Sequence, residues 1–287
     1  MSSSPQVSIV VDSAASLPTE FRGLPGLYVV PMSLQMKGEV FLDGIDISPT
    51  DFYRAQRGSS SITTTSSPSP AAFAEAFANA AQAGNDILCL TVASRFSSSA
   101  DSARAGAMQA AASLPNPRIE VLESGTAAGG EALVTLEAWR SAESGKSLDD
   151  VMAATSDVIS RVRLLAYLDT LYYLWKGGRV PGVAHLATSL LRLKPIFELR
   201  EGEVRNLARP RTRGRAAARL MRLMKERVDG DEVHATVIHA DAADEAERLR
   251  QEVSAAFECE ELFVSEFTPV MGTHTGPGML GIAFWSR

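Results

Sequence analysis

The chain has 287 residues, of which 45% are hydrophobic and 22% are charged, and its formal net charge is −6 at pH 7. This composition is ordinary for a globular protein with room for two domains, and the acidic balance argues against a general affinity for nucleic acid. No apolar run approaches the roughly 18 residues of a membrane-spanning helix, and no export signal precedes the first strand pattern, so we expect a cytoplasmic protein.

The first half of the chain alternates strand patterns with helix patterns. Short β-branched or apolar runs predict strands at 7–11, 27–36, 87–92 and 118–122, and turns rich in Ser and Thr open the helices between them. This alternation predicts an α/β domain over residues 1–165 that is built on a parallel sheet. The binding crevice should lie at the carboxyl edge of that sheet, where several hydroxyl and carboxyl side chains fall: Asp12, Ser13, Thr65, Ser124 and the serines of 94–99.

Residues 59–70 consist almost entirely of Ser, Thr and Pro. Composition alone is typical of a flexible linker. Ser69 and Pro70, however, are a good N-cap and first-turn pair for a helix over 71–83, so the preceding hydroxyls lie beside a helix N-terminus, where anions are favoured. A second hydroxyl-rich segment, 94–99, precedes the next helix. The sequence therefore favours an anion-holding edge here.

The second half mixes strands and helices and predicts an α+β domain over residues 166–287. Glu201 and Gly202 are a clear hairpin signal between two strand patterns. Residues 209–227 predict a helix with seven arginines and one lysine against a single glutamate. The two cysteines, Cys89 in an expected strand and Cys259 at an expected helix end, are interpreted as structural thiols. The scattered histidines have no metal-binding spacing, so we expect no metal and no cofactor.

The stretch 271–281 combines four glycines with Pro277 and His274. One interpretation is a turn that brings bare backbone and one imidazole close to a ligand. The alternative is a plain glycine-rich hairpin between strands at 262–267 and 280–285, with His274 at its tip. Both interpretations stay open at this point.

Two classes of chemistry can be weighed against these residues. Ser97, His274 and Asp12 could be assembled into a hydrolase triad, but no G-x-S-x-G elbow is present, and serine is so frequent that any histidine would find one nearby. No strand is followed by a dinucleotide-binding G-x-G-x-x-G. Hydroxyls at two helix starts and one imidazole in a glycine-rich stretch suit an anion-binding site better. We interpret the chain as a binding protein and not as an enzyme.

Seven segments taken together resemble the DegV family of fatty-acid-binding proteins, in the family's order and spacing and over nearly the whole chain. They are Val11-Asp12-Ser13, Asp43-Gly44-Ile45-Asp46-Ile47, Thr65-Ser66-Ser67-Pro68-Ser69, the 94–99 segment, Tyr173-Leu174-Trp175-Lys176-Gly177-Gly178-Arg179, Lys194-Pro195-Ile196 and Gly272-Thr273-His274-Thr275-Gly276-Pro277-Gly278. The resemblance implies a two-domain protein that encloses one long-chain fatty acid, with the second domain closing the tunnel around its tail. It also implies a separate ATP-binding fatty-acid kinase subunit, which phosphorylates the bound carboxylate to an acyl phosphate for phospholipid synthesis.

Carried onto this sequence, the resemblance assigns the carboxylate to Thr65 and Ser97, with His274 nearby. The family usually has Ser-Ser-x-Leu-Ser-Gly-Thr where this chain has Ala-Ser-Arg-Phe-Ser-Ser-Ser at 93–99. One serine and the glycine of that motif are therefore missing. Ser94 or Ser98 is consequently an alternative contact for the carboxylate.

The basic run at 209–227 has three interpretations. Clustered arginines could bind nucleic acid, although no recognised motif accompanies them and we expect no nucleic-acid partner. They could form a solvated helix face that covers apolar surface. They could also dock the kinase subunit, for which the resemblance points to Arg211, with Lys176 and Arg179 in the same role. A transient membrane contact is compatible with a lipid ligand.

Overall fold

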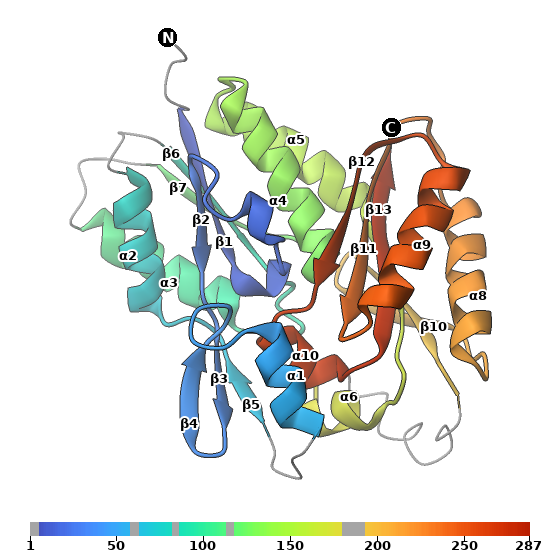
Figure 1. Cartoon of the computed structure of the whole chain (residues 1–287). Coiled ribbons are helices and arrows are strands. Elements are labelled where there is room, and N and C mark those ends of the chain that lie inside the picture. Colours follow the sequence, from blue (N-terminus) through green and yellow to red (C-terminus); the bar gives the residue numbers. More distant parts are fainter. Residues whose placement is uncertain (1–5, 58–62, 82–85, 113–117, 180–192) are drawn as a thin grey trace.

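The computed structural model describes residues 6–57, 63–81, 86–112, 118–179 and 193–287. Within them, layers of helices alternate with two large β-sheets, so that each sheet has helices on both faces (Figure 1). This confirms the predicted α/β fold class. No helix in the described part of the chain is both long enough and apolar enough to cross a membrane.

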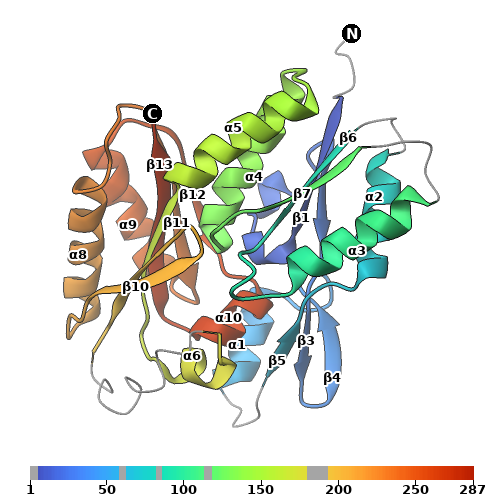
Figure 2. The same cartoon turned by 180° about the vertical axis from the view of Figure 1, so that it is seen from behind.

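The first large sheet, called here the parallel sheet, has the strand order β2-β1-β6-β7, and every pairing in it is parallel. All six residues of its strand β1 are buried, as expected for a strand with helices on both faces. Helices α2 and α3 cover its outer face (Figure 2). The elements are β1 (Val7–Asp12), β2 (Leu27–Val30), β6 (Asp86–Thr91), β7 (Ile119–Glu123), α2 (Pro70–Ala80) and α3 (Ser99–Ala111).

The second large sheet, called here the mixed sheet, has the order β10-β9-β8-β13-β11-β12. Only the pair β11 and β12 runs parallel. The predicted α+β character of the second half is thereby confirmed, including the hairpin at Glu201 and Gly202. The elements are β8 (Arg163–Tyr167), β9 (Ile196–Arg200), β10 (Glu203–Ala208), β11 (Val233–Ala240), β12 (Cys259–Glu266), β13 (Met279–Ser286) and the outer helices α8 (Arg213–Lys225) and α9 (Ala243–Ala256).

Helix α4 (Ala128–Glu143) lies between the two large sheets and is followed by α5 (Leu148–Arg161). It contacts β1 and β6 on one side and β8, β11 and β13 on the other. Its four consecutive residues Leu133, Val134, Thr135 and Leu136 are all fully buried, which is the pattern of a helix without a solvent face. The two sheets therefore share one continuous hydrophobic core. Strand β8 spans the expected boundary between residues 165 and 166, and that division into domains stays a prediction.

A small antiparallel sheet and several short helices surround the carboxyl edge of the parallel sheet. Ser69 caps α2 as predicted, because its Oγ accepts a hydrogen bond from the backbone N–H of Ala72 at 3.1 Å. The remaining elements are β3 (Ser33–Met36), β4 (Glu39–Leu42), β5 (Thr64–Ser66), α1 (Pro49–Arg57), α6 (Tyr172–Gly177), α10 (Pro269–Thr275) and the 3-10 turns η1 (Ser13–Ala15) and η2 (Thr19–Phe21).

Several sequence-based boundaries were wrong. The strand expected at 27–36 is two strands, β2 and β3, which belong to different sheets. They are separated at Pro31, which has no backbone N–H to donate to a neighbouring strand. The linker interpretation of 59–70 is wrong for its second half, because β5 pairs with β3; residues 59–62 lie outside the described residues. The basic helix begins at Arg213, after Thr212 as its N-cap. Cys259 begins β12 and does not end a helix.

The glycine-rich stretch is neither a turn nor a hairpin over its first half. Residues Pro269–Thr275 form the helix α10, and the flanking strands do not pair, because β11 lies between β12 and β13. Pro269 occupies the first turn, and Gly276 ends the helix with φ +71°, a conformation that favours glycine. The bulk that Gly276 avoids is the ring of Tyr173, which a Cβ would overlap. The glycine therefore serves packing within the chain.

Candidate functional site

A cavity of about 450 Å³ lies between the carboxyl edge of the parallel sheet and the α4-facing side of the mixed sheet. This volume is within the range of about 300–1,000 Å³ that is usual for small-molecule sites. Its wall takes residues from both halves of the chain, including the start of α4 and the strands β8 and β9. The site is therefore formed only when both sheets are in place.

Most of the cavity wall is apolar. Side chains from the mixed sheet alternate, so that Leu164 and Ala166 of β8 face the cavity while Leu165 and Tyr167 pack on the opposite side against α8 and α9. The same alternation places Phe197 and Leu199 of β9 in the wall. Further apolar lining comes from Met32, Phe96, Leu168, Leu174, Val204 and Phe267.

One end of the cavity is polar, and its centre is a hydrogen bond between the two halves of the chain. Oγ1 of Thr65, on β5, lies 2.8 Å from Nε2 of His274, on α10. Both residues line the cavity. Thr65 and His274 are 209 positions apart in the sequence, so the fold alone brings them together.

His274 is a neutral imidazole at this end. Burial, and secondarily the positive charge of Arg179, lower the pKa of His274 to about 4. Its Nδ1 has no hydrogen-bond partner among the described residues and lies against Gly177, where a Cβ would overlap it. Gly177, in the segment that the family resemblance singled out, therefore makes room for the imidazole.

The serine-rich loop before α3 forms a second part of the polar end. Ser97 and Ser98 line the cavity, together with Ser66 and Ser67 of the β5 segment. The Oγ atoms of Ser67 and Ser98 are 2.9 Å apart, which joins the two hydroxyl clusters. Helices α3 and α4 both begin at the cavity wall. The partial positive charge at their N-terminal ends favours an anion here.

Two buried carboxylates hold the loops of the polar end in place. Asp12 accepts hydrogen bonds from the Ser99 hydroxyl at the start of α3 and from the backbone N–H groups of Ala14 and Val92. Burial raises the pKa of Asp12 to about 6 in spite of these hydrogen bonds. Asp43 accepts from the backbone N–H of Val270, in the first turn of α10, at 3.0 Å. In the sequence, Asp43 stood out only as part of the 43–47 segment of the family resemblance.

The remaining candidate residues divide by position. Arg179 is half-buried and lines the cavity beside His274, a position that the sequence did not indicate. Ser94 is exposed and absent from the lining; its backbone N–H donates to Glu123 Oε2 at 3.0 Å. Lys176 and Arg211 are both exposed, the former on α6 and the latter just before the N-cap of α8. Only Arg179 among the three basic candidates is part of the cavity.

The hydrolase triad is not assembled. The carboxylate of Asp12 is occupied by α3 and its own loop, and His274 contacts Thr65. Ser97 Oγ accepts a hydrogen bond from the backbone N–H of Ser99 at 3.2 Å. Within the described part of the chain, no group of three or more His, Cys, Asp or Glu side chains could hold a metal ion.

Comparisons with known proteins show the family and the fold of the chain. A family model described as the DegV family of uncharacterised proteins matches residues 6–287. A DegV domain-containing protein of Streptomyces coelicolor is 33% identical over 286 residues, which cover 98% of this chain and 99% of that protein. The solved structure of a DegV family protein from Thermus thermophilus, described as fatty-acid-binding, has a TM-score of 0.91 at 30% identity and covers 98% of this chain and 100% of that one. DegV from Bacillus subtilis, described as a fatty acid binding protein, has a TM-score of 0.88 at 26% identity, with 99% and 100% coverage.

Proposed function

Because the chain belongs to the DegV family, and because its cavity of about 450 Å³ has an apolar body and a hydroxyl-lined end, we propose that it binds a single long-chain fatty acid. The carboxylate lies at Thr65, Ser97 and His274, and the tail extends along β8 and β9. The observation that carries this proposal is the hydrogen-bonded pair Thr65 and His274 at the polar end of the cavity. Solved relatives from Thermus thermophilus and Bacillus subtilis, both described as fatty-acid-binding, support it.

The apolar wall accounts for the affinity. Burying about fifteen methylenes at roughly 0.8 kcal/mol each contributes on the order of 12 kcal/mol before ordering costs are subtracted. The tail alone therefore supplies enough free energy for tight binding. The polar end must only offset the cost of removing a carboxylate from water, which is several kcal/mol without donors.

Neutral His274 orders the donors around the carboxylate. In the Nε2–H tautomer its ring donates to Thr65 Oγ1, which leaves the threonine hydrogen free to be donated to the ligand. Ser97 and Ser98 offer further hydroxyls, and the guanidinium of Arg179 supplies a positive charge in the same wall. A carboxylate bound there is paired without a formal salt bridge to the imidazole.

We further propose that the protein presents this carboxylate to a separate ATP-binding kinase subunit in the cytoplasm, for acyl-phosphate formation and phospholipid metabolism. Exposed Ser66 and Ser98 lie at the polar end, so a partner could reach the head group from outside. Arg211 and Lys176 are exposed and available for docking. Three other arginines of the basic run are bonded to carboxylates of this chain: Arg213 to Asp169, Arg219 to Glu226 and Arg227 to Glu198.

A transient membrane contact for ligand exchange fits the surface of α6. Tyr172 and Trp175 are 44% and 49% exposed there, and Leu174 on the same helix lines the cavity. Lys176 lies over the Tyr172 ring, 4.8 Å from its centroid. Aromatic side chains beside a lysine are the usual residues of a membrane interface.

The decisive experiment is organic extraction of the purified, folded protein followed by mass spectrometry of the extract. We expect about one long-chain acid per chain. Repeated absence of a stoichiometric acyl chain, together with no uptake of added oleate or palmitate, would refute the fatty-acid proposal. The docking proposal is tested separately with Arg211→Glu: fatty-acid occupancy should stay complete while phosphorylation by the cognate kinase is lost.

A further inference from the structure

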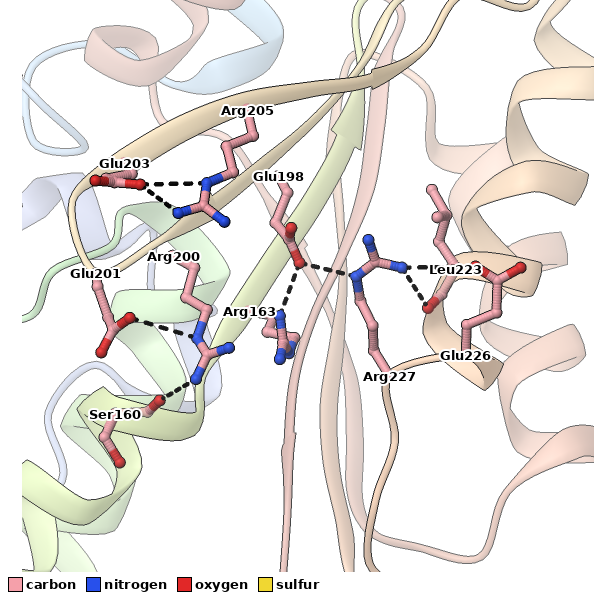
Figure 3. A network of polar contacts seen from close by, with 10 residues as sticks. All are labelled: Ser160, Arg163, Glu198, Arg200, Glu201, Glu203, Arg205, Leu223, Glu226 and Arg227. Atoms are coloured by element: carbon pink, nitrogen blue, oxygen red, sulfur yellow. Dashed lines mark hydrogen bonds and ion pairs between the residues drawn. The ribbon is translucent and has the colours of Figure 1, made fainter.

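A second, small cavity lies at the end of the mixed sheet opposite the polar end of the fatty-acid cavity. Its wall includes four arginines, Arg161, Arg163, Arg200 and Arg227, and its volume is about 60 Å³. Arg161 ends α5, Arg163 begins β8, Arg200 ends β9, and Arg227 follows α8, so three layers of the fold converge here. Figure 3 shows Arg163 and Arg227 directed at Glu198, and Arg200 directed at Ser160 and Glu201. Asp229 is the acidic residue of the wall.

The carboxylates that pair with these arginines lie outside the cavity wall, in which Asp229 is the acidic residue. Arg163 Nη1 and Arg227 Nε both donate to the same atom, Oε1 of Glu198, at 3.0 and 2.9 Å. The Glu198 side chain is only 8% exposed, so two positive charges share one buried negative charge (Figure 3). Asp229, in turn, accepts a hydrogen bond from the Ser286 hydroxyl at 2.9 Å. Arg227 Nη1 also lies 3.7 Å from Glu226 Oε2, but neither Glu198 nor Glu226 is part of the cavity wall.

The other two arginines make mostly weak or exposed contacts. Arg200 donates from Nη2 to the Ser160 carbonyl at 3.0 Å, but its Nε is buried and has no hydrogen-bond partner within the described residues. The nearest carboxylate oxygen to that Nε belongs to exposed Glu201, at 3.7 Å, which is beyond hydrogen-bond range. Arg161 pairs with exposed Asp157 on its own helix. Four guanidinium groups against one carboxylate in the wall make the space between them electropositive.

We propose that this arginine cavity, defined by Arg161, Arg163, Arg200 and Arg227, binds a phosphate group, either as inorganic phosphate or as the head of a small phosphate monoester. Arginine is the preferred phosphate ligand because its planar donors match the oxygens in pairs. A buried water needs about 10–15 Å³ of cavity volume. The space therefore admits roughly four to six waters, or one tetrahedral oxyanion. A bound oxyanion gives Arg200 Nε its missing acceptor and ties the end of α5 to β9 and to the end of α8.

The test is isothermal titration calorimetry of the full chain in phosphate-free buffer at constant ionic strength. Inorganic phosphate and glycerol 3-phosphate are titrated separately, with sodium chloride as the reference salt. Arg200→Gln removes the unpartnered donor, and Arg205→Gln is the matched control. Arg205 is a neighbouring arginine on β10 that pairs with exposed Glu203 outside the cavity wall (Figure 3). Arg161→Gln is a second, more exposed variant in case Arg200→Gln fails to fold.

We expect saturable binding of at least one probe to the unmodified protein. Loss of one hydrogen bond to a charged group should weaken that binding about ten- to a hundredfold in Arg200→Gln or Arg161→Gln, and Arg205→Gln should leave it unchanged. Binding of inorganic phosphate identifies the free anion, and binding of glycerol 3-phosphate alone identifies a monoester. The proposal is overturned if neither probe binds, or if Arg205→Gln reduces binding as much as Arg200→Gln does. Fatty-acid occupancy is not part of this test, so the two sites succeed or fail independently.

Discussion

Replacing Thr65 by valine tests the head-group site with the smallest change of shape. Valine keeps the β-branched outline of threonine on β5 but removes the Oγ1 atom that lies 2.8 Å from Nε2 of His274. Two effects follow. The apoprotein loses one hydrogen bond, worth about 0.5–1.5 kcal/mol, and the complex also loses a donor to the ligand carboxylate, worth about 1.5–3 kcal/mol. Affinity for the fatty acid should therefore fall by roughly ten- to a hundredfold, since each 1.4 kcal/mol is a factor of ten.

The assay is displacement of a fluorescent fatty acid from delipidated protein, together with urea unfolding of the same preparation. Thr64→Val is the matched control, because Thr64 is the neighbouring exposed residue on the same strand and is absent from the cavity wall. The control should bind as the unmodified protein does. The reasoning fails if Thr65→Val and Ser97→Ala both retain full affinity, because the carboxylate would then lie elsewhere.

Three further predictions concern His274, its neighbour Gly177 and an ion pair near the far end of α4. Gly177→Ala should lower fatty-acid affinity in the displacement assay without removing any polar group, because the added Cβ overlaps Nδ1 of His274; unchanged affinity would mean that the imidazole can move freely. The pKa of His274 is lowered to about 4, so between pH 6.5 and 4 the unfolded chain takes up a proton that the folded chain refuses. As the pH is lowered from 6.5 to 4, the free energy of unfolding should therefore decrease more steeply than in His274→Gln, by at most about 1.4 kcal/mol per pH unit. Identical pH profiles of the two proteins would contradict the lowered pKa. Arg140→Met should cost about 1.5–3 kcal/mol in urea unfolding, because it removes two donors to Glu261, and Arg140→Met combined with Glu261→Met should recover part of that loss.

The parallel sheet was predictable because its strands are short apolar runs and its helices begin with recognisable caps. Such signals are local: Ser69 before Pro70 predicts a helix start wherever the pair occurs, and the structure confirms it. The third strand of the small sheet, β5, was missed for the opposite reason. Strand β5 is three residues of Thr and Ser, and it is a strand only because β3 provides the partner.

The helix α10 was missed because its residues do not favour helix on their own. Seven residues with an internal glycine are too few for a stable isolated helix. Tertiary contacts fix it instead, including the hydrogen bond from its Val270 N–H to Asp43. The position of Arg179 in the cavity wall was also missed, and the residue was assigned to docking. That position depends on how α6 folds back against α10, which sequence spacing does not reveal.

The two halves of the head-group site are fixed through one short segment of the chain. Asp12 at the end of β1 holds the start of α3 through Ser99, and therefore holds the loop that carries Ser97. The next residue, Ser13, donates to Asp43 at 2.6 Å, and Asp43 holds the first turn of α10, which carries His274. The hydroxyls and the imidazole are thus positioned before any ligand arrives. Because binding then need not order these loops, little of the free energy contributed by the buried tail is lost at the head group, and hydroxyl donors beside the Arg179 guanidinium can hold the carboxylate.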